Sequence, residues 1–131
     1  MTFSLVARCS KTGMFGVAIT SSSPAVASRC AYTRSKVGAV ASQNVTDPTL
    51  GPKTLDRMQN GSSAKQAVEE ALRDNQFLEY RQILAIDKNG QTANYSGANS
   101  LGTWADWTGK NVISAGNLLA NADVPKKIVE S

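Results

Sequence analysis

The 131-residue sequence predicts a single-domain α+β fold in which antiparallel sheet is covered by helices. Residues 2–9 alternate between two faces with the period of a strand, whereas residues 64–72 carry apolar side chains at the period of a helix. The predicted elements follow one another as a hairpin and a strand, two helices, a second hairpin and strand, and a final helix. This order favours sheet with helices packed on its faces.

The chain opens with a predicted hairpin. Residues 2–9 form its first strand, residues 10–13 are turn-forming, and residues 14–21 return as the second strand. The serines and the proline at 21–24 end that strand. A third strand, rich in small residues, is predicted at 37–43.

Two helices are predicted next. Pro52 suits the first turn of one helix, and Asn60 with Gly61 suits its end. Ser63 and Gln66 have the spacing of a capping box at the start of the other helix. Its apolar stripe is expected to pack in the core and consists of Ala64, Ala67, Val68, Ala71 and Leu72.

The second half is predicted to return to strands. Residues 80–87 contain the continuous apolar run 83–86, which is typical of a central strand covered on both faces. The remaining predicted elements are a turn at 88–90, a strand at 91–96, a loop at 101–109 that carries both tryptophans, a strand at 111–116 and a helix from 124.

The composition limits the partners of the chain. Its formal net charge is +4, but the basic residues are scattered, and the densest group is Arg29, Arg34 and Lys36. That group is thin for a nucleic-acid surface; it suits a small anionic ligand or, more commonly, solvated surface charge. No apolar run approaches the roughly 20 residues that span a bilayer, and no secretory signal is visible. We therefore expect a cytoplasmic protein with a small-molecule partner, no nucleic acid and no membrane.

The chain has two cysteines, Cys9 and Cys30, and no histidine. The cysteines are too few and too far apart in sequence for a zinc site or a redox pair, so we expect them to be free, with no metal bound. The absence of histidine excludes a Ser-His-Asp or Cys-His mechanism within the chain. Any catalytic base must therefore be an amine, a carboxylate or water.

Thr2 directly follows Met1 and opens the first predicted strand. After removal of Met1, Thr2 would carry a hydroxyl nucleophile and a free α-amine that can accept the hydroxyl proton. An α-amine has a pKa of roughly 7.7–8.0, which suits a base working near neutrality. The competing interpretation is an ordinary strand residue, because threonine is common in strands.

Short segments along the whole chain match a known pattern in the same order. They are residues 1–8, 16–19 with the serines that follow, 37–44, 50–53, 80–82, Asp87 with Gly90, and 115–119. In these segments the chain resembles a bacterial family catalogued as domain of unknown function 1028. No single segment is very specific, but their collinearity is.

That family is placed in the N-terminal-nucleophile (Ntn) hydrolase superfamily. The resemblance implies one domain over residues 1–131, built as a four-layer αββα sandwich with two antiparallel sheets face to face and helices outside. By superfamily analogy it implies amide hydrolysis or acyl transfer on a small amide, with no metal or cofactor.

The chain departs from the family pattern in two places. Family members usually continue past the length of this chain, so the last strands of the sandwich are expected to be missing. We expect the exposed edges, or the Trp104/Trp107 surface, to be masked by a second copy in a homo-oligomer. Proteasome-like relatives also carry an aspartate after the second strand and a lysine near the third. Here only Arg34 and Lys36 approach the lysine position.

The candidate catalytic residues are Thr2, Arg34 and Lys36. The two cations precede the third strand, where a positive charge could hold the α-amine neutral, or where they form an exposed basic turn. We expect all three residues to flank one cleft. The resulting hypothesis is an amidohydrolase of unknown substrate, and the alternative is a non-catalytic ligand-binding or assembly module that retains Met1.

The candidate binding residues follow the second and third predicted strands. Ser21, Ser22 and Ser23 could bind the amine or a substrate carboxylate, or simply cap the end of a strand. Gln43 and Asn44 could donate hydrogen bonds to an oxyanion, although turn formation explains Asn44 equally well.

Overall fold

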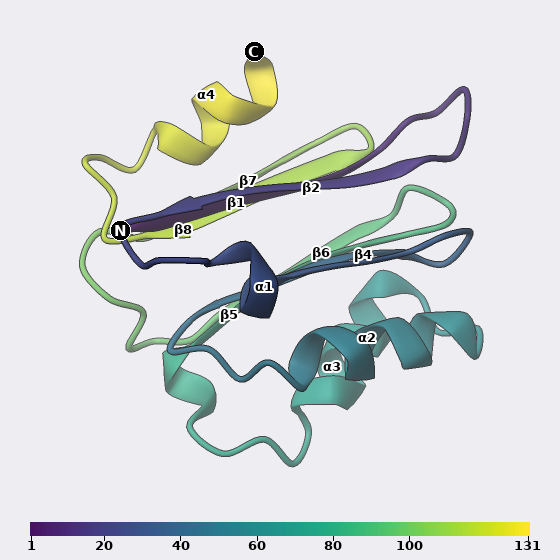
Figure 1. The fold of residues 1–131 in the computed structure, drawn as a ribbon, viewed down its shortest axis with the longest axis horizontal. Coiled ribbons are helices and arrows are strands. Elements are labelled where there is room, and N and C mark those ends of the chain that lie inside the picture. The colour runs from purple at the N-terminus through teal and green to yellow at the C-terminus, as the bar shows by residue number, and fades with distance from the viewer.

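The computed structural model describes residues 1–131 and shows two four-stranded antiparallel sheets packed face to face (Figure 1). The first sheet has the strand order β2-β1-β8-β7, and the second has the order β3-β4-β5-β6. The strands are β1 (Thr2–Arg8), β2 (Phe15–Ser21), β3 (Ala31–Arg34), β4 (Gly38–Asn44), β5 (Arg81–Asp87), β6 (Thr92–Ser96), β7 (Ala105–Gly109) and β8 (Val112–Asn117). The predicted α+β class with antiparallel sheet is thus confirmed.

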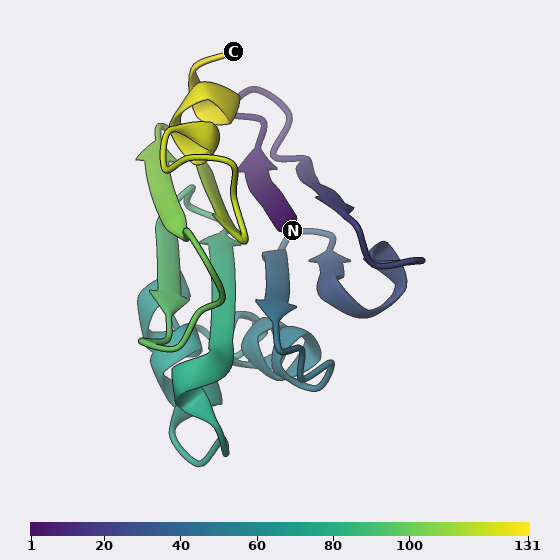
Figure 2. The same ribbon diagram turned by 90° about the vertical axis from the view of Figure 1, so that its left-hand side faces the viewer.

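The helices lie outside the two sheets. Helices α2 (Leu50–Gln59) and α3 (Ala64–Leu72) contact β4, β5 and β6 of the second sheet, and α4 (Val124–Glu130) contacts β7, β8 and β1 of the first. Figure 2 shows α4 at one end of the view and α2 with α3 at the other, with the strands between them. A short α1 (Ala27–Cys30) precedes β3, and a 3-10 turn (Leu78–Tyr80) precedes β5. No helix has the length and apolar character needed to cross a membrane.

The apolar core has two parts, one on each face of the second sheet. Ile83 and Ala85 belong to the cluster beneath α2 and α3, whereas Leu84 and Ile86 belong to the cluster between the sheets. The apolar run in β5 is therefore covered on both faces within its own chain, as its sequence predicts.

The predicted helix ends are confirmed. Ser63 Oγ accepts a hydrogen bond from the Gln66 backbone N–H, and the Gln66 side chain accepts one from the Ser63 backbone N–H, which completes a capping box. Helix α2 ends at Gln59, and Gly61 follows with φ +104°, a conformation that glycine adopts readily. The predicted apolar stripe of α3 is buried in full.

Two of the eight strands were not predicted from the sequence. Residues 105–109, predicted as a loop, form β7, and residues 31–34 form β3 between α1 and β4. Each lies at the edge of its sheet and pairs with one neighbour, β8 or β4 respectively. Edge strands are held mainly by backbone hydrogen bonds and are short or polar, so their sequences lack the apolar alternation by which buried strands are recognised.

Candidate functional site

The layer between the two sheets is apolar at its centre and polar at the end where the chain begins. Val6, Ile113 and Leu84 lie in its buried apolar cluster. Directly paired residues on neighbouring strands share a face of the sheet. At the polar end the ladders pair Ser21 with Thr2 and Thr2 with Asn117 in the first sheet, and Gln43 with Gln82 and Gln82 with Ser96 in the second.

Three buried carboxamides join these two polar rows. Gln43 Nε2 donates to Gln82 Oε1 at 2.8 Å, and Asn117 Nδ2 donates to the same oxygen at 3.1 Å. Gln82 Nε2 donates to Ser96 Oγ at 3.0 Å. All three carboxamide residues are at most 3% exposed. The second sheet therefore contributes an ordered hydrogen-bond network that crosses to the first.

Two backbone carbonyls fix which way these amides point. Gln43 Nε2 lies 3.2 Å from the Ala115 oxygen, and Gln82 Nε2 lies 3.2 Å from the Gly116 oxygen. A flipped amide would bring two acceptors together at either position. Gln43 Oε1 is left as a buried acceptor without a donor. Such an atom needs an explanation, because nearly all buried polar atoms in proteins are paired.

The hydroxyl of Thr2 belongs to a chain of hydrogen bonds. Thr2 Oγ1 and Ser21 Oγ lie 2.8 Å apart, and the Ser23 backbone N–H donates to Ser21 Oγ at 3.1 Å. Ser21 Oγ also donates to the Met1 carbonyl at 3.0 Å. Ser22 points elsewhere: its hydroxyl accepts a hydrogen bond from the Met1 ammonium at 3.1 Å.

A cavity of about 320 Å³ opens beside this chain of hydroxyls. The predicted residues that line it are Thr2, Ser21, Ser23, Gln43 and Asn44. The other lining residues are Val26, Arg29, Cys30 and Thr46, so no carboxylate borders the cavity. The structure thus brings together five of the eight residues singled out by sequence.

Arg29 is held in the cavity wall by the loop that precedes it. Its Nη2 donates to Ser23 Oγ at 2.7 Å, and its Nη1 donates to the carbonyl oxygens of Pro24 at 2.8 Å and Ala25 at 3.2 Å. Because Ser23 also bonds Ser21, the polar chain runs without a break from the guanidinium to Thr2.

Tyr32 supports the backbone of this arginine. The Tyr32 hydroxyl lies 2.8 Å from the carbonyl oxygen of Arg29 and 2.9 Å from that of Pro48. Burial raises the pKa of Tyr32, and the charge of Asp47 adds to the rise, so the phenol stays neutral and keeps its donor.

The two predicted amide donors have other partners. Both Nε2 hydrogens of Gln43 are accounted for by Gln82 and Ala115, so its side chain has no free N–H for the expected oxyanion role, and its Oε1 is the atom left without a partner. Asn44 has φ +79°; its Nδ2 donates to the Tyr80 carbonyl, and its Oδ1 accepts from the Leu101 N–H at 3.2 Å. The Asn44 side chain therefore fixes the end of β4.

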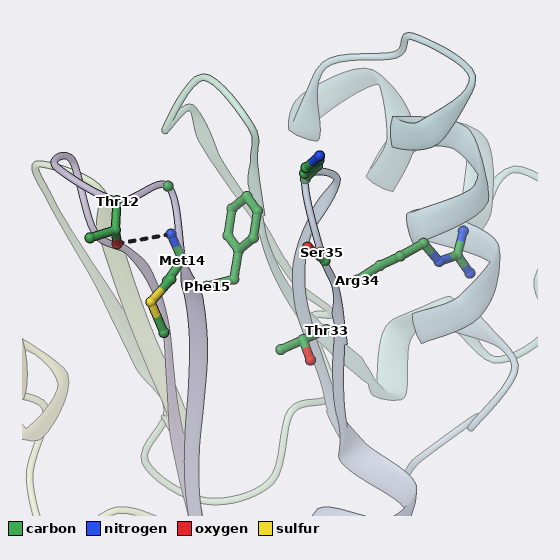
Figure 3. A pocket seen from close by; sticks show the side chains of 8 residues that line it. Thr12, Met14, Phe15, Thr33, Arg34 and Ser35 are labelled. Carbon is green, nitrogen blue, oxygen red and sulfur yellow. Dashed lines mark hydrogen bonds between the residues drawn. The ribbon is translucent and has the colours of Figure 1, made fainter.

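The expectation that Thr2, Arg34 and Lys36 flank one cleft is wrong. Arg34 and Lys36 line a different cavity, of about 340 Å³, between the β1–β2 turn and the β3–β4 turn (Figure 3). Strand β1 runs from Thr2 to Arg8, so that turn lies roughly 20 Å from Thr2. The physical reason is β3, which the sequence pattern does not reveal and which carries the chain away from the start of β1.

The residues of the larger cavity have ordinary structural partners. In Figure 3 the Arg34 side chain points away from the cavity, where it donates to Asp56 at 2.8 Å and to Gln59 at 2.7 Å on α2. Cys9 lies in the nearby turn, and hydrogen bonds from Thr12, chiefly from its side chain, lower the pKa of this exposed thiol. Cys9 and Cys30 are both free, as expected.

Sequence reasoning did not place Arg29, Thr46, Gln82 and Asn117 in the site. By sequence, Arg29 belongs only to the densest basic group, and no pattern singles out Thr46, Gln82 or Asn117. One sequence signal was available: polar residues interrupt β5 and β8 at the ends where apolar residues would continue the buried pattern. Polar residues at buried strand positions indicate a polar cleft.

The fold and the site together define the class of protein. It has two packed antiparallel sheets with outer helices, and a polar cleft at the start of a central strand. The chain belongs to the family of unknown function DUF1028, whose family model matches residues 2–131. It is similar to the crystal structure of protein SPO2555 from Silicibacter pomeroyi, also described as DUF1028, with 27% sequence identity and a TM-score of 0.94. The match covers 98% of this chain and 57% of that one. No curated protein matched the sequence.

Proposed function

We propose that this chain is an amidohydrolase of the Ntn type, in which Thr2 becomes the N-terminal nucleophile after removal of Met1. One observation carries the proposal: the Thr2 hydroxyl, at the start of a central strand, is hydrogen-bonded to Ser21 and borders the polar cavity. The order of helix, sheet, sheet and helix also supports it, because this is the layering that the Ntn resemblance implies.

The α-amine of Thr2 is the proposed base. It takes the hydroxyl proton as Oγ1 attacks the amide carbonyl, and the resulting tetrahedral intermediate expels the amine product, which receives that proton. The acyl group is then an ester on Oγ1. Water, deprotonated by the same amine, then attacks the ester. The bond between the acyl group and Oγ1 breaks, the carboxylic acid leaves, and the proton held by the amine passes to Oγ1, so that the threonine is regenerated.

Ser21 is the proposed positioning residue for this proton transfer. In the chain that begins at Met1, its hydroxyl hydrogen is directed to the Met1 carbonyl. Without Met1 that hydrogen is released, and Ser21 Oγ is still held by the Ser23 N–H and by Thr2 Oγ1. Ser21 can then hydrogen-bond both the hydroxyl and the new amine, which keeps the nucleophile and its base aligned.

The proposal is tested by N-terminal mass and covalent labelling. We expect the purified chain to lack Met1 and to react at Thr2, as shown by peptide mapping, with a β-lactone, which acylates nucleophilic hydroxyls and thiols. Thr2→Ala should abolish the adduct, and Thr2→Ser should keep it. A chain with a non-removable N-terminal extension is the matched control, since it retains the threonine but not the free amine. Labelling of that extended chain at the normal rate would contradict the proposed mechanism.

A second function is favoured by how well Met1 fits. Its ammonium donates to Ser22 Oγ, and its carbonyl accepts hydrogen bonds from Ser21 Oγ and the Ser22 N–H. A chain that keeps Met1 in this arrangement would be a non-catalytic ligand-binding or assembly module. Intact mass separates the two, because only the hydrolase requires the loss of Met1.

A further inference from the structure

We infer that the cavity beside Thr2 binds a free carboxylate through Arg29, so that its ligands are small amides that carry a carboxylate. The inference deepens the proposed hydrolase by naming its substrate class. Only the cleavage of the ligand rests on that proposed function; the carboxylate site is argued from Arg29 and Gln43 alone.

Arg29 gives the cavity a single, uncompensated positive charge. It is the only charged residue in the wall, which otherwise consists of hydroxyls, amides, a thiol and one valine. Arg34, Arg57 and Lys126 form salt bridges elsewhere in the chain, but Arg29 has no carboxylate partner. A cation in a cleft without acidic residues attracts an anionic ligand.

The guanidinium is already oriented for such a ligand. Three protein acceptors hold Nη1 and Nη2, and they leave the Nε–H and one Nη2 hydrogen of the five donors without a protein acceptor. Planar guanidinium donors match the two oxygens of a carboxylate. Because the side chain is fixed by its own loop, little of its conformational freedom remains to be lost on binding.

Gln43 provides the second, independent observation. Gln43 is 1% exposed and borders the same cavity, and its Oε1 is a buried acceptor without a donor. The backbone contact to Ala115 prevents the amide from turning to satisfy that oxygen. A ligand N–H would satisfy it, so the wall is complementary to a molecule that has both a carboxylate and an amide N–H.

The size and charge of the cavity narrow the class further. A volume of about 320 Å³ is at the lower end for small-molecule sites, so it suits a ligand of a few heavy atoms beyond the reacting amide. One arginine balances a carboxylate, whereas a phosphate dianion calls for more positive charge than the wall supplies. N-acyl amino acids have the required combination of groups.

The test compares ligands that differ only in charge. N-acetylglycine and N-acetylglycinamide share the amide N–H, and only the first has a carboxylate. Binding is followed by backbone amide NMR on the full 131-residue Thr2→Ala variant, which cannot turn the ligand over. We expect N-acetylglycine to bind at least about ten-fold more tightly, with shifts at Ser23, Arg29 and Gln43.

Variants of Arg29 then test whether its positive charge causes the preference for N-acetylglycine. Arg29→Gln should remove the preference for N-acetylglycine, and Arg29→Lys should retain part of it. Arg73→Gln is the matched control, because it removes an exposed arginine outside the cavity and should leave the preference intact. Circular dichroism checks that each variant folds, and the comparison of the two ligands on the chain with Arg29 intact does not depend on any of these variants.

Each result decides one proposal. Equal affinity for the two ligands, no binding of either, or tighter binding of inorganic phosphate than of N-acetylglycine overturns the carboxylate site. Preferential N-acetylglycine binding without β-lactone labelling of Thr2 in the Met1-free chain supports the site and refutes the hydrolase. Thr2 labelling by a β-lactone without that preference supports the hydrolase and refutes the site.

Discussion

Gln82 is the residue on which the buried polar network converges. Its side chain accepts from Gln43 and Asn117 and donates to Ser96 and the Gly116 carbonyl. Removing one member of such a network leaves its partners as unpaired buried polar groups, which is costly. The polar end of the layer therefore depends on Gln82, which does not itself border the cavity.

We expect Gln82→Leu to lower the free energy of unfolding by about 2–4 kcal/mol, because it leaves two buried amide donors without their acceptor. Urea denaturation measures this loss. Gln76→Leu is the control, since its side chain lies on an exposed loop before β5, and it should change stability by less than about 0.5 kcal/mol. Equal effects of the two substitutions would show that the network contributes no stability.

The loops around β5 are tied together by Arg81 and Asp47. Arg81 donates to the carbonyl oxygens of Val45 and Gln76 and to Asn75 Oδ1, while Asn75 Nδ2 donates to Asp47 Oδ2. Asp47 Oδ1 accepts two further bonds from Thr49. These contacts hold the segment between β4 and α2 that carries Thr46 into the cavity wall.

This arrangement predicts a pH dependence of stability. Burial alone would raise the pKa of Asp47, but hydrogen bonds from Thr49 and Asn75 and the charge of Arg81 outweigh it and lower the pKa. A lowered pKa means that the stabilisation is complete above the unfolded pKa of about 3.9 and is lost as the pH falls through the folded pKa.

Asp47→Asn should therefore destabilise the protein at pH 6, and the difference from the parent chain should shrink below about pH 4. Unfolding by urea at a series of pH values measures it. Asp123→Asn is the control, because the Asp123 backbone N–H, rather than its carboxylate, makes the local hydrogen bond. A stability difference at Asp47 that is constant from pH 6 to pH 3 would contradict this account.

At the scale of the whole molecule, the surface that carries Trp104 and Trp107 is the candidate contact between copies of the chain. The apolar run 83–86 is covered within its own chain, so it does not itself require a partner. Trp104 and Trp107 are 39% and 42% exposed, and Lys126 lies over the Trp107 ring at 5.0 Å. Exposed tryptophans are common at protein interfaces, which keeps the homo-oligomer as a proposal centred on this surface.

We expect light scattering to show an oligomer, and Trp107→Lys to shift it towards the monomer by placing a second positive charge beside Lys126. Phe77→Lys is the matched control, because it alters an exposed aromatic residue outside that surface. A stable monomer at high concentration, with unchanged tryptophan fluorescence on dilution, would refute the proposal.

The elements that contribute to the core were predictable from sequence because burial leaves a pattern, which is periodic where one face is buried and a continuous apolar run where both faces are buried. Helix α3, with its capping box and apolar stripe, and strand β5 illustrate this. Thr2, Ser21, Ser23, Gln43 and Asn44 were also recognisable as site candidates, since each begins, ends or closely follows a predicted strand. Local periodicity and the turn-forming residues that end strands and helices depend only on neighbouring residues, so they can be recognised without knowledge of the fold.

The tertiary structure decided the two unpredicted edge strands and the positions of the basic residues relative to Thr2. Strands β3 and β7 exist because backbone hydrogen bonds extend a sheet edge, which imposes little on their side chains. The separation of Arg34 and Lys36 from Thr2 follows from β3, and the placement of Arg29 follows from a loop that folds back on Ser23. Distances between residues far apart in sequence depend on strand order and register, and these are set by the packing of the whole chain.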